Sequence, residues 1–125
     1  MSNQELESHV VSLEIAKQLK EEGWKKETEF WWEWGQMSKK WDIVKNITCP
    51  NNGVDRFGVD YYPAPLATEI LEELPVTISN YDLTIRKDEE GFYNVHYASL
   101  IMISRIGLPN ALAMIYVWLK KENLL

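Results

Sequence analysis

The chain is predicted to be an α+β protein, with an antiparallel sheet of about four strands packed against three helices in two layers. Two patterns predict this class. Three segments repeat apolar residues at helical spacing, and four shorter segments alternate apolar and polar residues as half-buried strands do. The strand segments form two pairs joined by short links, which favours antiparallel pairing. The expected order is therefore α-β-β-α-β-β-α.

The first helix is expected over about residues 13–22. Ser12 is a good N-cap, because its side chain can accept a hydrogen bond from an amide of the first turn. Gly23 stands where many helices end in a left-handed residue. Trp24 could then close onto Leu19 in a Schellman motif, which would give this tryptophan a structural role.

Two aromatic strands are expected next, over about 28–35 and 40–45, joined by a hairpin link. Alternation in the first strand predicts that its even-numbered aromatic residues face the core: Phe30, Trp32 and Trp34. Trp31 is the exception, because it shares its face with two glutamates. Four of the six tryptophans lie between residues 31 and 41, and the sequence leaves open whether this cluster is core or surface.

The middle of the chain is expected to be a loop followed by an extended segment and a helix. Residues 46–58 combine asparagine, glycine and proline, which is loop chemistry. Tyr61 and Tyr62 precede two prolines that favour an extended backbone. The second helix should run over about 65–74, because Pro65 suits the first helical position and Pro75 ends the helix.

The last part of the chain predicts a β-hairpin and a buried helix. The hairpin strands are expected over about 81–87 and 92–98, with an acidic turn at 88–91. The apolar run at 100–103 fits either a helix or a strand. The third helix is expected over about 109–122, and its apolar residues go almost all the way round, which implies burial on several sides.

Length and composition indicate a flexible N-terminus over 1–10 and a single α+β domain over 11–125. The one cysteine, Cys49, excludes a disulfide within the chain and a thiolate zinc site. No apolar run reaches the roughly 18 residues of a membrane helix, so no membrane partner is expected. The N-terminus lacks the pattern of a secretion signal, and the expected location is the cytoplasm.

The charge of the chain argues against nucleic acid as a partner. The formal net charge is −6, which repels phosphate backbones at long range. Residues 17–45 interleave lysines with aromatic residues, as platforms for single strands do, but the acidic residues of this segment nearly cancel the charge of its lysines.

The sequence contains no motif for catalysis, metal binding or phosphate binding, so neither an enzyme nor a cofactor is expected. His96 is expected on a strand, facing away from the core, without a nucleophile beside it. A Cys49–His96 pair is the one conceivable dyad, and only Lys45 is near in sequence to lower the pKa of the thiol.

Several sequence blocks together resemble a group of short hypothetical proteins of bacterial phages, prophages and mobile elements. The blocks are Val-Ser-Leu-Glu-Ile-Ala-Lys-Gln-Leu-Lys-Glu-Glu-Gly-Trp at 11–24, Tyr-Pro-Ala-Pro at 62–65, Glu-Leu-Pro at 73–75, Pro-Asn-Ala-Leu-Ala at 109–113 and Trp-Leu-Lys-Lys-Glu-Asn at 118–123. The resemblance covers roughly residues 11–123. It implies a viral or mobile-element origin and the bacterial cytoplasm, and it carries no activity and no functional residues.

The leading hypothesis is a non-enzymatic module that binds a protein partner or a second copy of itself. Aromatic residues dominate such interfaces, and Trp31, Tyr61 and Tyr62 are the candidate contact residues, together with the loop at 46–58. The alternative is an acidic inhibitor of a host nucleic-acid-processing protein, which would mimic nucleic acid through the acids of the second helix and the turn at 88–90. A small enzyme is the remote third hypothesis.

Overall fold

The computed structural model describes residues 3–35, 37–45 and 61–125. The elements, in chain order, are α1 (Asn3–His9), α2 (Leu13–Glu21), β1 (Phe30–Gly35), β2 (Lys40–Lys45), β3 (Tyr61–Pro63), α3 (Ala67–Leu71), β4 (Thr77–Ile78), β5 (Tyr81–Lys87), β6 (Phe92–Tyr97), β7 (Ile101–Ile106) and α4 (Leu108–Lys121). Helices and antiparallel sheets share one chain, so the predicted α+β class is confirmed.

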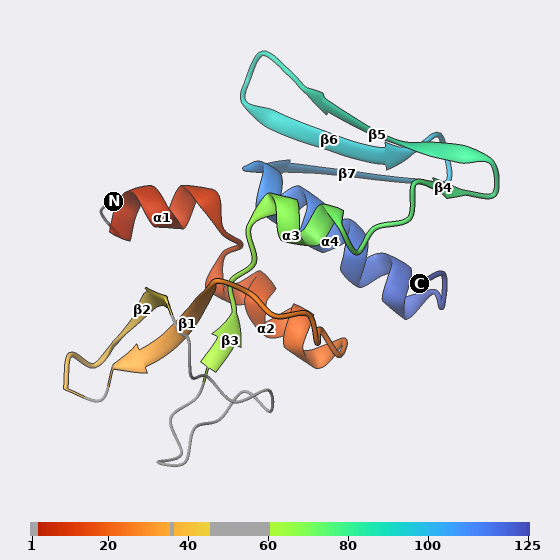
Figure 1. Ribbon diagram of the computed structural model, residues 1–125. Coiled ribbons are helices and arrows are strands. Elements are labelled where there is room, and N and C mark those ends of the chain that lie inside the picture. Colours follow the sequence, from red (N-terminus) through yellow and green to blue (C-terminus); the bar gives the residue numbers. More distant parts are fainter. Residues whose placement is uncertain (1–2, 36, 46–60) are drawn as a thin grey trace.

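The strands form two sheets, where the sequence predicted one of about four strands. One sheet has the order β2-β1-β3 and the other the order β4-β5-β6-β7, and every pairing is antiparallel (Figure 1). The extended segment Tyr61–Pro63 also pairs with β1, because Tyr62 lies opposite Trp32. It is therefore a third strand of this sheet, β3. Each predicted hairpin therefore belongs to its own sheet.

The first helix of the prediction is α2, and its capping is confirmed. The Ser12 side chain accepts a hydrogen bond from the Ile15 amide at 3.3 Å. At the other end, the Trp24 amide donates to the Leu19 carbonyl at 3.0 Å, and Gly23 has a φ of 85°. This is the expected Schellman motif.

The Schellman motif brings Trp24 into the core. Its ring packs edge-to-face on Tyr116 of α4, with the ring centroids 5.0 Å apart. A second contact, between the N-cap of α2 and α4, is polar: the Ser12 amide donates to the Asn110 side-chain oxygen at 2.8 Å. The start of α2 and the turn after its end are thus both tied to α4.

α4 is the element on which most of the others pack. Eight of its fourteen residues are buried: Pro109, Ala111, Leu112, Ala113, Ile115, Tyr116, Val117 and Leu119. The helix contacts β6 and β7 as well as α2 and α3, which is the burial on several sides that its sequence predicts. From the sheet, the Tyr97 hydroxyl donates to the Pro75 carbonyl at 2.6 Å and ties β6 to the segment after α3.

Three elements differ from the sequence prediction. Residues 3–9 form α1, where a flexible N-terminus over 1–10 was expected, because the next residue, Val10, is buried and bridges to Leu66. The second helix is the short α3, which gives way to a turn before Pro75. Residues 101–103 of the undecided run belong to β7, which pairs with β6 along its whole length.

Replacing Gly23 with alanine should lower the free energy of unfolding by about 1 kcal/mol, because a side chain disfavours the positive φ that ends α2. No atom lies within 4 Å of an added Cβ, so strain of the backbone is the whole effect. Urea denaturation measures the change. Gly23→Asn is the matched control, and it should lower the free energy of unfolding by less than alanine does. An alanine variant as stable as the wild type would contradict the Schellman assignment.

Alkaline pH should destabilise the fold through Tyr97. Burial raises the pKa of its hydroxyl from 10.0 to about 12. The contribution of this proton to stability is full below pH 10 and is lost as pH rises from 10 to about 12. Urea midpoints measured across that range should fall less steeply for Tyr97→Phe than for the wild type. Tyr81→Phe, at an exposed tyrosine, should follow the wild type; equal slopes for all three would contradict the account.

Candidate functional site

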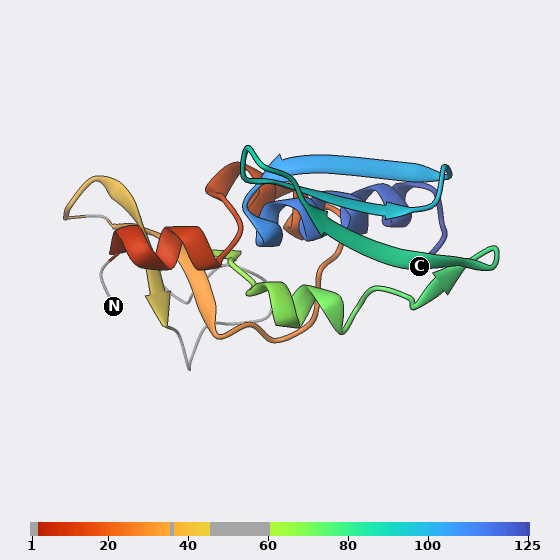
Figure 2. The same cartoon turned by 90° about the horizontal axis from the view of Figure 1, so that it is seen from above.

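The four-stranded sheet has two unlike faces. On its inner face, Val95 and Tyr97 of β6 are fully buried, and α4 contacts both β6 and β7. In Figure 1 the helices lie below this sheet, and none of the described helices lies on its other side. Figure 2 shows the same arrangement from above, with the strands of the sheet lying over α4. Within the described residues, the outer face therefore has no covering layer.

Strand register determines which side chains share the outer face. The β6–β7 pairs on this face are Phe92 with Ile106, Asn94 with Ser104, and His96 with Met102. Met102 is 64% exposed, Ile106 is 67% exposed, and Phe92 is half-buried. We call Phe92, Met102 and Ile106 the outer stripe. Single exposed apolar side chains are ordinary, but three on one bare sheet face make this face a candidate contact surface.

The outer stripe lies beside an unpaired strand edge. β7 is the last strand of its sheet, and no other strand of the described chain pairs with its second edge. Such an edge presents a row of backbone donors and acceptors that can pair with another chain. Proteins usually protect edges with prolines, several charges or short strands. β7 has six residues, no proline and one charged residue, Arg105, whereas the opposite edge strand, β4, has only two residues.

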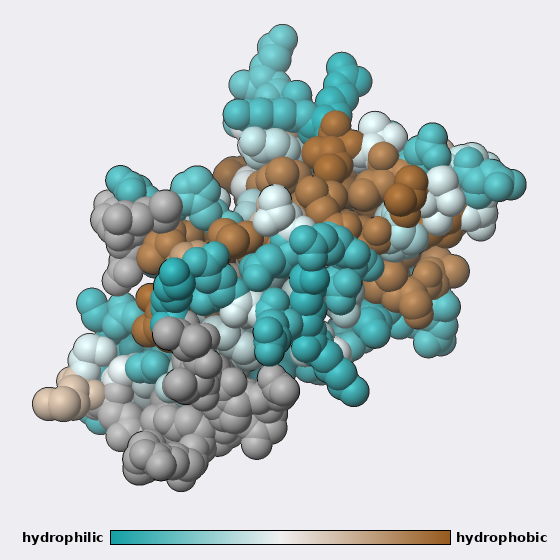
Figure 3. All heavy atoms as spheres, viewed as in Figure 1, coloured by the Kyte–Doolittle hydropathy of each residue, from teal (hydrophilic) through white to brown (hydrophobic). Residues whose placement is uncertain are grey.

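One flank of α4, on the inner side of the four-stranded sheet, also has partly exposed apolar side chains. The Asn110 side-chain amide donates to the Ile106 carbonyl at 3.4 Å, so this side of α4 meets the end of β7. Met114 and Trp118 follow Asn110 at intervals of four residues, which keeps them on the same side of the helix. Both are only half-buried. We call Met114 and Trp118 the α4 flank. Figure 3 shows, from the side of α3, hydrophobic side chains gathered where the four-stranded sheet meets the helices below it.

The candidate contact residues of the sequence do not meet in one patch. Tyr61 is only 8% exposed. Trp31 is half-buried and lies on the same face of the three-stranded sheet as Tyr61, whereas Tyr62 lies on the opposite face, beside Trp32 in the register. The fourth candidate, the loop at 46–58, lies outside the described residues. The structure therefore brings two of these side chains to one face and separates the third.

Tyr62 belongs to a cluster of aromatic residues beneath α2. The ring of Trp41 lies 5.5 Å from the rings of both Trp34 and Tyr62. The ammonium groups of Lys20 and Lys17 lie 4.8 and 5.6 Å from the centroid of the Tyr62 ring. These contacts join α2 to the sheet, and they cover ring surface that a stacking platform for bases would need.

Of the four clustered tryptophans, Trp32 is buried and its ring nitrogen donates to the Val11 carbonyl at 3.0 Å. The other three are half-buried: Trp31, Trp34 and Trp41. Trp34 and Trp41 contact each other across the β1–β2 pair. The cluster is therefore mainly a packing element of the three-stranded sheet.

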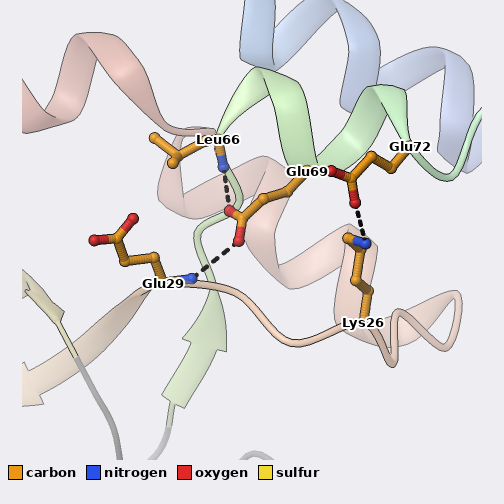
Figure 4. A network of polar contacts seen from close by, with 5 residues as sticks. All are labelled: Lys26, Glu29, Leu66, Glu69 and Glu72. Atoms are coloured by element: carbon orange, nitrogen blue, oxygen red, sulfur yellow. Dashed lines mark hydrogen bonds and ion pairs between the residues drawn. The ribbon is translucent and has the colours of Figure 1, made fainter.

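Two acids of the second predicted helix are bonded within the protein. The Glu69 carboxylate accepts from the Leu66 amide at 2.8 Å and from the Glu29 amide at 3.1 Å (Figure 4). Glu72 forms an ion pair with Lys26, and this hydrogen bond raises the pKa of the lysine. The network joins the start of α3 to the entry of β1, which gives both acids a structural role.

The acidic turn between β5 and β6 is organised by its first residue. One side-chain oxygen of Asp88 accepts from the Glu90 amide at 2.9 Å and from the Phe92 amide at 3.0 Å. Gly91 completes the turn with a φ of 92°. Asp88 therefore shapes the turn, and Glu89 and Glu90 are exposed at its tip.

Of the conceivable dyad, only His96 lies within the described residues. His96 lies opposite Thr84 on one neighbouring strand and Met102 on the other, so its partners in the register include no carboxylate. Cys49, its conceivable partner, lies outside the described residues. Within the described ranges, no group of three or more histidine, cysteine, aspartate or glutamate side chains could hold a metal ion.

A groove of about 660 Å³ lies between α1, the start of β1 and the starts of α3 and α4. Its walls are mainly apolar, including Leu6, Phe30 and Leu108, and its titratable groups are His9, Glu29 and Tyr93. Glu29 is already paired with Lys45 at 3.2 Å. The groove has room for an apolar ligand, but its lining does not select a class of ligand.

Comparisons with protein-family models, with curated proteins and with solved structures found no match to this chain. Among the residues that the structure describes, no helix has the length and apolar character needed to cross a membrane. The site is therefore interpreted from its geometry.

The sequence does not single out the outer stripe, although it contains a signal for it. Residues 101–106 are apolar at positions that face both sides of a strand. Ile101 and Ile103 face inward, and Met102 and Ile106 face outward. A strand that is apolar on both faces is typical of a sheet covered on both sides. The structure covers only one side.

Methionine oxidation should report the bare outer face. In dilute protein, peroxide should oxidise Met102 nearly as fast as Met37, which is 99% exposed, and faster than the half-buried Met114. Peptide mass spectrometry after timed oxidation measures the three rates in one sample. A Met102 as slow as Met114 would mean that the outer face is covered, contrary to the structure.

Proposed function

We propose that this chain is a non-enzymatic protein-interaction module that binds a partner along β7. The observation that carries the proposal is the unpaired edge of β7 beside the exposed outer stripe. An added strand would satisfy the backbone groups of the edge, and its alternate side chains would lie against the stripe. The module is proposed to have a phage or mobile-element origin and to act in the bacterial cytoplasm. This part rests on the resemblance of the sequence blocks.

The geometry favours β7 over Trp31, Tyr61 and Tyr62 as the main contact region. Tyr61 is buried, and the Tyr62 ring is engaged by Lys17 and Lys20. Hot-spot residues must be able to bury new surface on binding. Trp31 keeps part of its surface and remains a secondary candidate on the other sheet.

The nucleic-acid-mimic alternative has less support from the geometry. Glu69 and Glu72 of the second predicted helix are engaged in the network of Figure 4. At the turn, Asp88 is engaged by backbone amides. Mimicry of a phosphate row requires carboxylates that a basic partner can reach. Glu73 of the second predicted helix and Glu89 and Glu90 at the turn are exposed, and they are few for such a row.

Strand binding at β7 is tested by selecting peptides from a random library displayed on a carrier. The immobilised protein should enrich extended peptides with alternating apolar residues, because one face of an added strand meets the outer stripe. Their affinity should fall about tenfold or more in Met102→Lys with Ile106→Lys, because charges on the edge disfavour strand addition.

The matched control carries the same charge change elsewhere, at two exposed apolar residues, Met37→Lys with Val76→Lys. These residues are 99% and 79% exposed and lie outside β7. Selected peptides should bind this control as they bind the wild type. Peptides that bind both double variants equally, or a failure to enrich any peptide, would refute β7 as the binding edge.

A further inference from the structure

We propose that the partner strand is β7 of a second copy of this chain, and that two copies pair antiparallel to form one continuous eight-stranded sheet. This inference rests on the proposed function, because it assigns an occupant to the same edge. The order of strands would then run from β4 to β7 of one copy and from β7 to β4 of the other. The two edges would close each other, as in a two-fold symmetric interface.

Two carbonyls near one end of β7 already accept hydrogen bonds from side chains of the same chain. The carbonyl oxygens of Ser104 and Ile106 each accept a side-chain hydrogen bond, from Arg105 at 2.8 Å and from Asn110 at 3.4 Å. Local side chains thus partly satisfy the carbonyls at this end of β7. A second strand would supply amides to the edge and would also cover apolar side chains on both of its faces.

β7 is complementary to itself when Ser104 of one copy lies opposite Ser104 of the other. Residues directly opposite in an antiparallel pair share a face, so this register puts Met102 of each copy opposite Ile106 of the other. The outer stripes of the two copies then merge across the two-fold axis. On the inner face, each Ile103 lies opposite the Arg105 of the other copy, and the two arginines are offset diagonally.

The distribution of charge allows this pairing despite the net charge of −6. β7 contains no acidic residue. The acidic turn follows β5 and precedes Phe92, which lies opposite Ile106, so the turn is at the Ile106 end of the sheet. Antiparallel pairing places the two acidic turns at opposite ends of the joined sheet. Repulsion between the most acidic parts of the copies is therefore weak.

The α4 flank supplies area that the strands alone do not. A stable dimer buries about 1,200–2,000 Å² in total, which exceeds what one short strand pair covers. Met114 and Trp118 are half-buried on the side of α4 that meets the end of β7. Aromatic residues and methionine are enriched at interfaces. In the joined sheet the two α4 helices would lie below the new strand pair, with these side chains turned toward it.

Light scattering coupled to size exclusion tests the dimer with the full chain at a series of concentrations. The wild type should have a molar mass of twice the 14.7 kDa of the chain. In Met102→Lys with Ile106→Lys, the dissociation constant should rise about tenfold or more, because lysines replace apolar cross-strand pairs. Met37→Lys with Val76→Lys should remain dimeric. A monomeric wild type at all concentrations, or a dimer that both double variants keep, would overturn the proposal.

A cysteine at the axis tests the register and does not depend on the fold of the lysine variants. In a Cys49→Ser background, Ser104→Cys should form a disulfide between two copies under mild oxidation, because the two positions lie opposite each other. Thr84→Cys, on β5 of the same outer face, is the control and should stay reduced. Disulfide formation in the control but not in Ser104→Cys would refute the pairing.

These results separate the two proposals. A monomeric wild type that binds selected peptides in a β7-dependent way would refute the second copy as occupant and support β7 as a binding edge. A wild-type dimer that is insensitive to the β7 variants, together with peptides that ignore the same variants, would refute both.

Discussion

Burial of α4 is the constraint on which the rest of this structure depends. The helix is apolar nearly all round, so it needs apolar neighbours on several sides. β6 and β7 provide them on one side, and α2 and α3 provide them elsewhere. The buried side chains of α2 and the Trp24–Tyr116 contact follow from packing around this one helix.

Packing around α4 leaves one face of the four-stranded sheet uncovered by the described helices. The described helices lie on one side of the four-stranded sheet, so its other side stays open (Figure 1). An antiparallel sheet tolerates this when its outward residues are polar. Thr84 and Asn94 follow that rule, but Met102 and Ile106 do not. The exposed apolar residues collect on the edge strand, where a further strand can reach them. Function is inferred from this departure from the usual pattern.

The sequence predicts local structure better than it predicts assembly. The α2 cap, the Schellman motif at Gly23 and the hairpin of β5 and β6 are short-range features, because each depends on residues close in the chain. α1 escapes prediction because the contact between Val10 and Leu66 is long-range. The outer stripe could not be predicted for a related reason, because no local sequence pattern indicates which face of β7 the helices cover. The tryptophan cluster attracts attention in the sequence, yet it mainly packs one sheet.

Amide hydrogen exchange along β6 and β7 tests the central claim most directly. Among the described strands, β6 is paired on both sides and β7 on one. In dilute protein the amides of 92–97 should therefore exchange far more slowly than alternate amides of 101–106. The slow exchange should extend to all of 101–106 as protein concentration rises. If 101–106 exchanged as slowly as 92–97 in dilute monomeric protein, the edge would already be covered within one chain, and the account of β7 as an open edge would be wrong.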